Sequence, residues 1–155
     1  MGISVWRTKV DETMENREKS KEALLPCLET VQEMCGYIPQ EAITYLRENL
    51  DVPSIDIYGV ITFYGMLTTK EQGEYVIRIC DSLPCHLNKS DGVLGVIEKE
   101  LGIKAGETSA EKKFTLEVVP CLGLCDKAPA MMINDEIYEN LTDGSIKEII
   151  AELKR

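Results

Sequence analysis

Two cysteine pairs, each at the end of a β-prone run, most constrain how this chain can fold. Cys80 ends the run 74–80 and Cys85 follows it, while Cys121 and Cys125 follow the run 114–119. Residues 91–101, between the two runs, have the apolar spacing of a helix. A strand, a crossover helix and a second strand in one sheet usually run parallel, so both strands end at the same edge. The four thiols should therefore converge in two adjacent loops, where open α/β sheets usually bind ligands.

The rest of the pattern predicts an α+β or α/β chain with two regions. Apolar residues recur at helical spacing in the first half, which predicts helices over about 20–36, 40–50 and 55–64, with Ser20 as a cap. The second half adds two short strands, 130–133 and 136–138, and a final helix after Thr142. The order β-α-β-β-β-α is a thioredoxin-like layout. We expect an N-terminal helical bundle over residues 1–72 and a thioredoxin-like domain over residues 73–155.

Composition narrows the function classes and the compartment. The net charge of −10 argues against nucleic acid and anionic membranes as main partners. No apolar run approaches a transmembrane length, and the first residues lack the layout of a signal peptide, so we expect a cytoplasmic protein with no direct membrane insertion. In that compartment the six cysteines favour metal binding or redox chemistry over disulfides.

Four thiolates can hold either zinc or an iron–sulfur cluster. Structural zinc usually takes cysteine pairs with two-residue gaps, whereas the gaps here are four and three residues, which favours a two-iron cluster. A Rieske centre would need two histidines, and the chain has only His86. A zinc scaffold and a thiol–disulfide enzyme remain as alternatives. The second is disfavoured because neither pair is the C-x-x-C of such enzymes.

Three segments resemble one known family. They are YGVITFYG at residues 58–65, VIRICDSLPCH at 76–86 and CLGLCDKAP at 121–129. They are similar to the thioredoxin-like [2Fe–2S] ferredoxin family. That family includes the E subunit of bacterial NADH:quinone oxidoreductase (complex I) and the small subunit of NAD(P)-linked, electron-bifurcating [FeFe] hydrogenases.

The resemblance implies a cofactor, a ligand set and partners. It implies that one [2Fe–2S] cluster is held by Cys80, Cys85, Cys121 and Cys125. It also implies that the helical region docks on a flavoprotein subunit that carries FMN and the NAD(P) site, within a complex that contains a further iron–sulfur or hydrogenase subunit.

The chain has no catalytic motif of its own. It lacks a G-x-G-x-x-G after a strand and a Walker motif, so no nucleotide site is expected on it. We therefore expect an electron-transfer subunit of an NAD(P)H-linked oxidoreductase, either a bifurcating hydrogenase or a complex I-type module, with catalysis on other subunits.

The sequence also allows predictions for four further residues. Cys27 and Cys35 lie in a helical apolar stripe and should pack in a core. His86 follows a candidate ligand and is expected to be a surface or supporting residue, with no partner visible in the sequence. The N–H of Gly123 could point at a sulfur.

Two other patterns lead to expectations about the cluster and the surface. Pro84 and Pro120 each precede a candidate ligand and lack a backbone donor, which favours a low reduction potential. The apolar stretch at residues 63–66 and the pair Met131-Met132 favour core packing, with an interface to the flavoprotein as the alternative.

Overall fold

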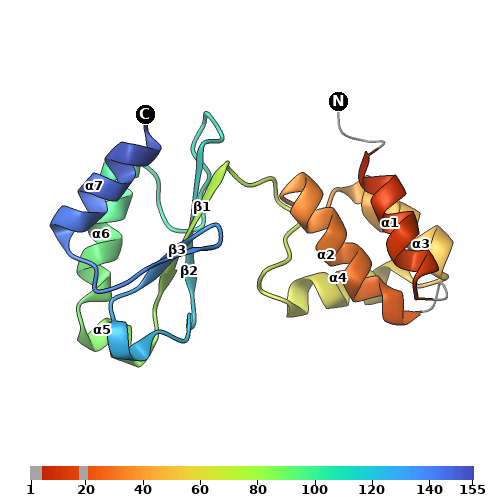
Figure 1. The fold of residues 1–155 in the computed structure, drawn as a ribbon, viewed down its shortest axis with the longest axis horizontal. Coiled ribbons are helices and arrows are strands. Elements are labelled where there is room, and N and C mark those ends of the chain that lie inside the picture. Colours follow the sequence, from red (N-terminus) through yellow and green to blue (C-terminus); the bar gives the residue numbers. More distant parts are fainter. Residues whose placement is uncertain (1–4, 18–20) are drawn as a thin grey trace. The chain divides into compact units, whose positions relative to one another are not determined.

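The computed structural model describes residues 5–17 and 21–155, which form two compact units, Met1–Glu71 and Gln72–Arg155 (Figure 1). The proposed helix cap at Ser20 lies outside the described residues. Among the helices in the described parts of the chain, none is both long and apolar enough to cross a membrane. The docking role assigned to the first unit stays a prediction.

The N-terminal unit is helical. Its elements are α1 (Val5–Glu15), the 3-10 turn η1 (Lys21–Ala23), α2 (Leu24–Cys35), α3 (Gln40–Leu50) and α4 (Ser54–Phe63). Gly36 ends α2 in the left-handed region at φ 77°, which favours glycine, and Pro39 lies just before α3. These helices confirm the predicted helical region. They bury one apolar core that contains Trp6, Leu28 and Leu46.

The first helix was not evident from the sequence. Trp6, Val10 and Met14 lie four residues apart on one face of α1, and all three are buried.

The apolar stretch at residues 63–66, which begins at the last residue of α4, differs from the expected core packing. Phe63 and Met66 are exposed, at 79% and 53%, so the expected core packing is wrong for them, while Met131 is buried as expected.

The C-terminal unit has the predicted order of elements. They are β1 (Tyr75–Cys80), α5 (Leu83–Leu87), α6 (Ser90–Leu101), β2 (Phe114–Val119), the 3-10 turn η2 (Cys125–Lys127), β3 (Met131–Ile133), β4 (Glu136–Tyr138) and α7 (Asp143–Leu153). The sheet order is β2-β1-β3-β4, with β1 and β2 parallel and the other pairs antiparallel. Helices α6 and α7 lie side by side on one face of this sheet (Figure 1). The thioredoxin-like prediction is confirmed, and α5 and η2 are additions to it.

The register of β1 and β2 sets the geometry of the sheet edge. Ile77 and Ile79 point into the core with α6 and α7, and the alternate residue Arg78 therefore points to the opposite face. Arg78 pairs with Glu117 across the strands, with its Nε 3.0 Å from Glu117 Oε2. Gln72 donates to the other carboxylate oxygen at 2.8 Å. Arg78 is 6% exposed, and a buried guanidinium is tolerated because this pairing satisfies it.

Gly73 brings the chain tightly against β2 before β1 begins. Its N–H donates to Thr115 Oγ1 at 2.7 Å, and a Cβ added to it would lie 2.7 Å from the backbone nitrogen of Phe114. No side chain fits there without moving the backbone of β2. Gly73 is therefore a packing requirement of the parallel pair.

We expect Gly73→Ala to destabilise the C-terminal unit by about 1–3 kcal/mol, because the added methyl group collides with the backbone. Hydrogen exchange of β1 and β2 peptides, followed by mass spectrometry, measures this. The matched control is Gly95→Ala in α6, where a Cβ meets nothing within 4 Å. This control should stabilise α6 by up to about 1 kcal/mol. Equal protection of the strands in both variants would contradict the packing requirement.

Candidate functional site

The four cysteines after the two strands meet at one edge of the sheet. Cys80 is the last residue of β1 and is paired with Val119, the last residue of β2, so Cys121 follows only two residues beyond that pairing. Cys85 lies in the middle of α5, and Cys125 begins η2. The structure therefore brings together the cysteines that the sequence singled out.

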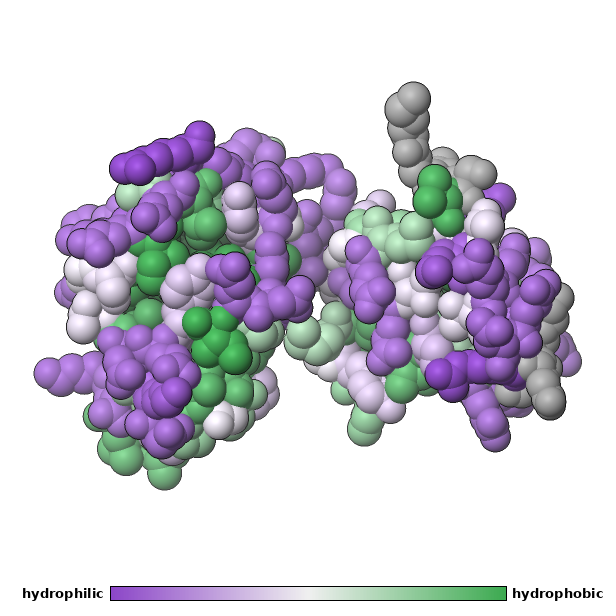
Figure 2. All heavy atoms as spheres, in the orientation of Figure 1, coloured by the Kyte–Doolittle hydropathy of each residue, from purple (hydrophilic) through white to green (hydrophobic). Residues whose placement is uncertain are grey.

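The thiols form two unlike pairs. Cys80 and Cys85 are 3% and 1% exposed, whereas Cys121 and Cys125 are exposed to solvent. Helix α5, which carries Cys85, has exposed Leu83 and Leu87 on its outer side. Figure 2 shows hydrophobic atoms at the lower edge of the C-terminal unit, where α5 lies in Figure 1. The site thus has a buried side and an open side.

The thiols influence one another electrostatically. Although Cys125 is exposed, partial desolvation by neighbouring atoms raises its pKa, as do the charge of Cys121, a hydrogen bond with Cys121 and the charges of Cys85 and Cys80. Burial likewise raises the pKa of Cys85, followed by a hydrogen bond with Cys80. Each of these two thiols thus responds more strongly to the other thiol of its own pair, and Cys125 responds to the first pair through charge. All four belong to one electrostatic site.

Cys80 is the thiol with the most hydrogen-bond support. Burial acts to raise its pKa, but hydrogen bonds from the Ser82 hydroxyl, the backbone N–H groups of Ser82 and Leu122, and Cys85 outweigh this, and the pKa of Cys80 lies below its ordinary value. The Ser82 oxygen lies 3.2 Å from Cys80 Sγ. Donors aimed at this sulfur stabilise its thiolate form, which is the form that binds metals.

The loop after β2 also points backbone donors at sulfur. The N–H of Gly123 donates to Cys121 Sγ at 3.3 Å, as the sequence suggested it could. Gly123 has φ 79° with nothing within 4 Å of an added Cβ, so its backbone conformation, and not space, is the reason that glycine suits this position. A backbone N–H of Ala130 donates to Cys85.

Hydrogen-bond donors to the sulfurs affect the expected reduction potential, because each donor stabilises the reduced form of a cluster. Pro84 and Pro120 lack N–H groups, but other residues supply donors to three of the four sulfurs. The prolines alone therefore do not determine how many hydrogen bonds the sulfurs accept. The low potential stays a prediction. Sequence reasoning missed Ser82, although a serine two residues after a candidate ligand was the available signal.

His86 has a partner that the sequence did not reveal. Its Nδ1 lies 3.2 Å from Asp91 Oδ2, between α5 and the first turn of α6, and both side chains are exposed. This places His86 at the surface, on the side of the first cysteine pair.

The other two cysteines belong to the N-terminal unit. Cys27 is fully buried in the helical core and Cys35 packs against that core, which agrees with their expected packing role. Burial raises the pKa of Cys27 to about 11, with smaller opposing effects from Arg17 and Asp11. Its thiol therefore stays protonated at neutral pH.

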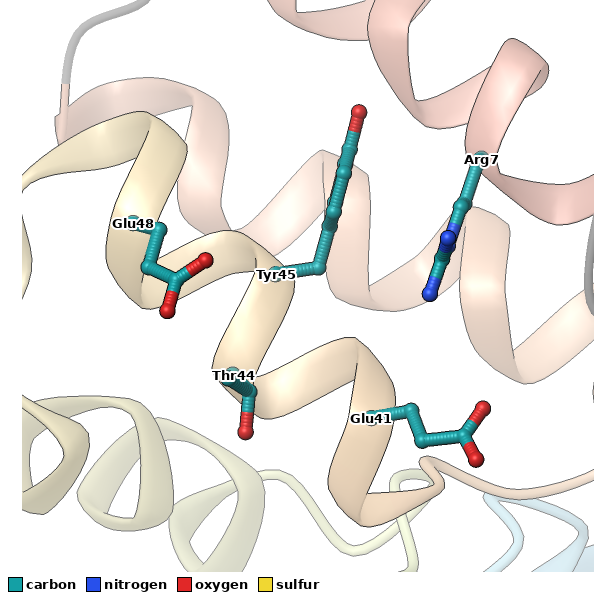
Figure 3. Close-up of a pocket in the computed structure, with 5 residues that line it drawn as sticks. All are labelled: Arg7, Glu41, Thr44, Tyr45 and Glu48. Carbon is teal, nitrogen blue, oxygen red and sulfur yellow. The ribbon is translucent and has the colours of Figure 1, made fainter.

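The N-terminal unit also carries a shallow hollow between α1 and α3 (Figure 3). Arg7 lies with its guanidinium carbon 5.4 Å from the centre of the Tyr45 ring, and the Tyr45 hydroxyl donates to Asp11 at 2.6 Å. Arg7 and Tyr45 thus contribute to the packing of these two helices.

We expect the N-terminal unit to lose about 1–3 kcal/mol of stability as the pH rises from 9 to 11. The folded state holds the proton of Cys27 up to a pKa of about 11, while the unfolded chain releases it near 9.0, so unfolding is favoured as the pH increases. Urea unfolding, followed through the fluorescence of Trp6 in the same core, measures the change. Cys27→Ala should keep only the dependence due to Cys35, whose pKa is raised by burial, and to Tyr45, whose pKa is raised chiefly by its hydrogen bond to Asp11. The same dependence in both proteins would contradict the assignment.

Comparison with known proteins agrees with this geometry. The sequence model of the thioredoxin-like [2Fe-2S] ferredoxin family matches residues 10–154. The E subunit of NADH-quinone oxidoreductase from Pseudomonas aeruginosa is 37% identical over 144 residues, which cover 93% of this chain and 87% of that protein. The corresponding E subunits of Rickettsia felis and Escherichia coli are 41% and 37% identical, and cover 85% and 96% of this chain and 80% and 89% of their own lengths.

A solved structure shares the fold. A chain of an NAD+-reducing [NiFe]-hydrogenase in the air-oxidized state superposes with a TM-score of 0.73 at 21% identity, covering 82% of this chain. The matched part is 22% of that hydrogenase chain, so this likeness concerns the fold alone. The family match spans nearly the whole sequence, and the relatives are similar along most of their length. The chain therefore belongs to the thioredoxin-like [2Fe-2S] ferredoxin family.

Proposed function

We propose that this chain holds one [2Fe–2S] cluster on Cys80, Cys85, Cys121 and Cys125 and transfers single electrons. The observation that carries the proposal is the placement of four thiols, in two pairs, at the carboxyl edge of the parallel strands. The donor groups aimed at these sulfurs fit an iron–sulfur site, where hydrogen bonds to sulfur are a usual support. Family membership supports the same cofactor.

The pairing of the thiols favours two irons over one zinc. A single tetrahedral zinc ion would hold all four sulfurs at equal separations of about 3.8 Å. Here the pKa of Cys125 is affected more strongly by Cys121 than by the first pair, and the pKa values of Cys80 and Cys85 are affected by each other, which favours two pairs over four equivalent sulfurs. A [2Fe–2S] cluster uses this arrangement, because each iron takes two of the four thiolates. A zinc scaffold is the competing outcome of the experiment below.

The two cysteine pairs differ in burial, so the proposed cluster site has an enclosed side and an open side. The protein encloses Cys80 and Cys85 and leaves Cys121 and Cys125 at the surface. When bound, the cluster would accept and release one electron at a time. The residues of this chain hold the sulfurs, donate hydrogen bonds to them and keep water from the first pair. We infer that electrons enter and leave on the open side, where a partner can approach most closely.

We further propose that the chain works as a subunit of an NAD(P)H-linked oxidoreductase in the cytoplasm. The relatives named above are subunits of NADH-quinone oxidoreductase, and the structural neighbour is an NAD+-reducing hydrogenase. The partner would be a flavoprotein subunit with FMN and the nicotinamide site, next to a further iron–sulfur or hydrogenase subunit. The exposed side chains of Phe63 and Met66 support a docking role for the N-terminal unit. The host complex would be an electron-bifurcating hydrogenase or a complex I-type module.

The direct test is anaerobic purification of the chain with iron and sulfide assays and EPR after dithionite reduction. We expect about two irons and two sulfides per chain and a rhombic signal from the reduced cluster. Cys→Ser at Cys80, Cys85, Cys121 or Cys125 should abolish or strongly alter the signal, because each change removes a ligand. Cys35→Ser is the matched control and should retain the cluster, because Cys35 packs in the helical unit. Zinc without sulfide would support the scaffold and overturn electron transfer.

Ser82 offers a finer test of the sulfur environment. We expect Ser82→Ala to lower the midpoint potential by about 20–60 mV, the equivalent of one hydrogen bond of about 0.5–1.5 kcal/mol for a one-electron couple. The physical reason is that the Ser82 hydroxyl, 3.2 Å from Cys80 Sγ, stabilises the more negative, reduced form. Potentiometric titration by EPR measures this change. Ser82→Thr keeps the hydroxyl and should lie close to the parent, and an unchanged potential in the alanine variant would exclude this role.

A further inference from the structure

Three potential metal ligands outside the thiol set meet beside the end of β1. One oxygen of Asp81, one of Asp91 and a ring nitrogen of His86 lie within 4.8 Å of one another. Asp81 directly follows β1, His86 lies in α5 and Asp91 lies in the first turn of α6, so the fold brings them together. We propose that this triad is a second metal site, one that binds a divalent first-row transition cation.

The spacing and the charge of the triad fit such a cation. Ligand bonds of about 2.0–2.2 Å place neighbouring ligand atoms about 3–4 Å apart around the metal. His86 Nδ1 and Asp91 Oδ2 are already 3.2 Å apart, and an oxygen of Asp81 lies within 4.8 Å of ligand atoms of both residues. Two carboxylates and one imidazole form a nitrogen–oxygen donor set of charge −2, which suits zinc, iron(II) or manganese.

A buried hydroxyl gives independent support for a ligand here. Ser90 is 3% exposed, and its Oγ has no hydrogen-bond partner among residues 5–17 and 21–155. Together with Asp81, Asp91 and Cys80 it lines a hollow of about 10 Å³, which is room for about one water molecule. An unpaired buried hydroxyl costs about 1–3 kcal/mol, so such groups are rare in folded proteins. A water molecule on a cation held by the triad would lie in this hollow and would provide the missing partner.

The electrostatic field at the triad also favours a cation. The first turn of α6 carries a partial positive charge of about half a unit, which by itself opposes a metal ion. The two carboxylates outweigh this charge and lie closer to the proposed ion. A bound ion would cross-link the end of β1, α5 and α6, which are the segments that frame Cys80 and Cys85. The site uses none of the thiols as ligands, although Cys80 lines the hollow beside it.

The test is a Zn²⁺ titration of the cluster-loaded full chain by isothermal titration calorimetry, after iron and sulfide have been assayed. We expect the parent to bind one Zn²⁺ more than His86→Ala does, and Asp91→Asn to weaken that site about tenfold or more. Asp126→Asn is the matched control, because it makes the same charge change beside Cys125, away from the triad. Its zinc affinity should stay within about twofold of the parent.

His86 supplies a second readout because it is the only histidine in the chain. Zn²⁺ should protect it from diethylpyrocarbonate in the parent and in Asp126→Asn, but not in Asp91→Asn, as measured by mass spectrometry. Equal zinc binding by the parent and His86→Ala, or an unchanged modification rate of His86, overturns the site. Because the zinc result is a difference between variants, it is independent of whether the thiols hold the cluster. A chain without iron and sulfide would count against the proposed function alone.

Discussion

The parallel pairing of β1 with β2 is the constraint on which the rest of the C-terminal unit depends. It places Cys80 opposite Val119, and so sets where the loop with Cys121 begins. A slip of one residue would turn every side chain of a strand to the opposite face, moving Arg78 into the apolar core and Ile79 out of it. The partly buried ion pair between Arg78 and Glu117 therefore favours the observed register over a shifted one.

The two cysteine pairs are supported in different ways. Cys80 and Cys85 are enclosed by a strand end and a short helix, whereas Cys121 and Cys125 belong to a loop whose shape depends on the left-handed backbone of Gly123. The enclosed pair lies in a drier environment, and the exposed pair lies where a partner can reach it. In the proposed function, this asymmetry separates the holding of the cluster from the exchange of electrons.

Much of this architecture could be predicted from the sequence, because it follows from topology. The β-prone runs, the intervening helix and the handedness rule together predicted that the cysteine loops would meet. Phe63 was misjudged, because a short apolar run has the same pattern whether it is buried or exposed. Contacts between distant segments were beyond sequence reasoning, since Asp91 meets His86 only through the way α5 turns into α6. The backbone of Leu122 likewise reaches Cys80 only after β1 and β2 have paired.

The seclusion of Cys27 has a consequence for how a cofactor is assembled on this chain. Soft metal ions bind thiols with little discrimination, so a chain with six cysteines offers several competing destinations for iron. Once the helical unit has folded, Cys27 no longer competes for iron, because its thiol is buried and stays protonated. In the proposed function, the four ligands would thus be selected by exclusion as well as by geometry. Maturation would proceed with the fewest errors when the helical unit folds before iron is delivered.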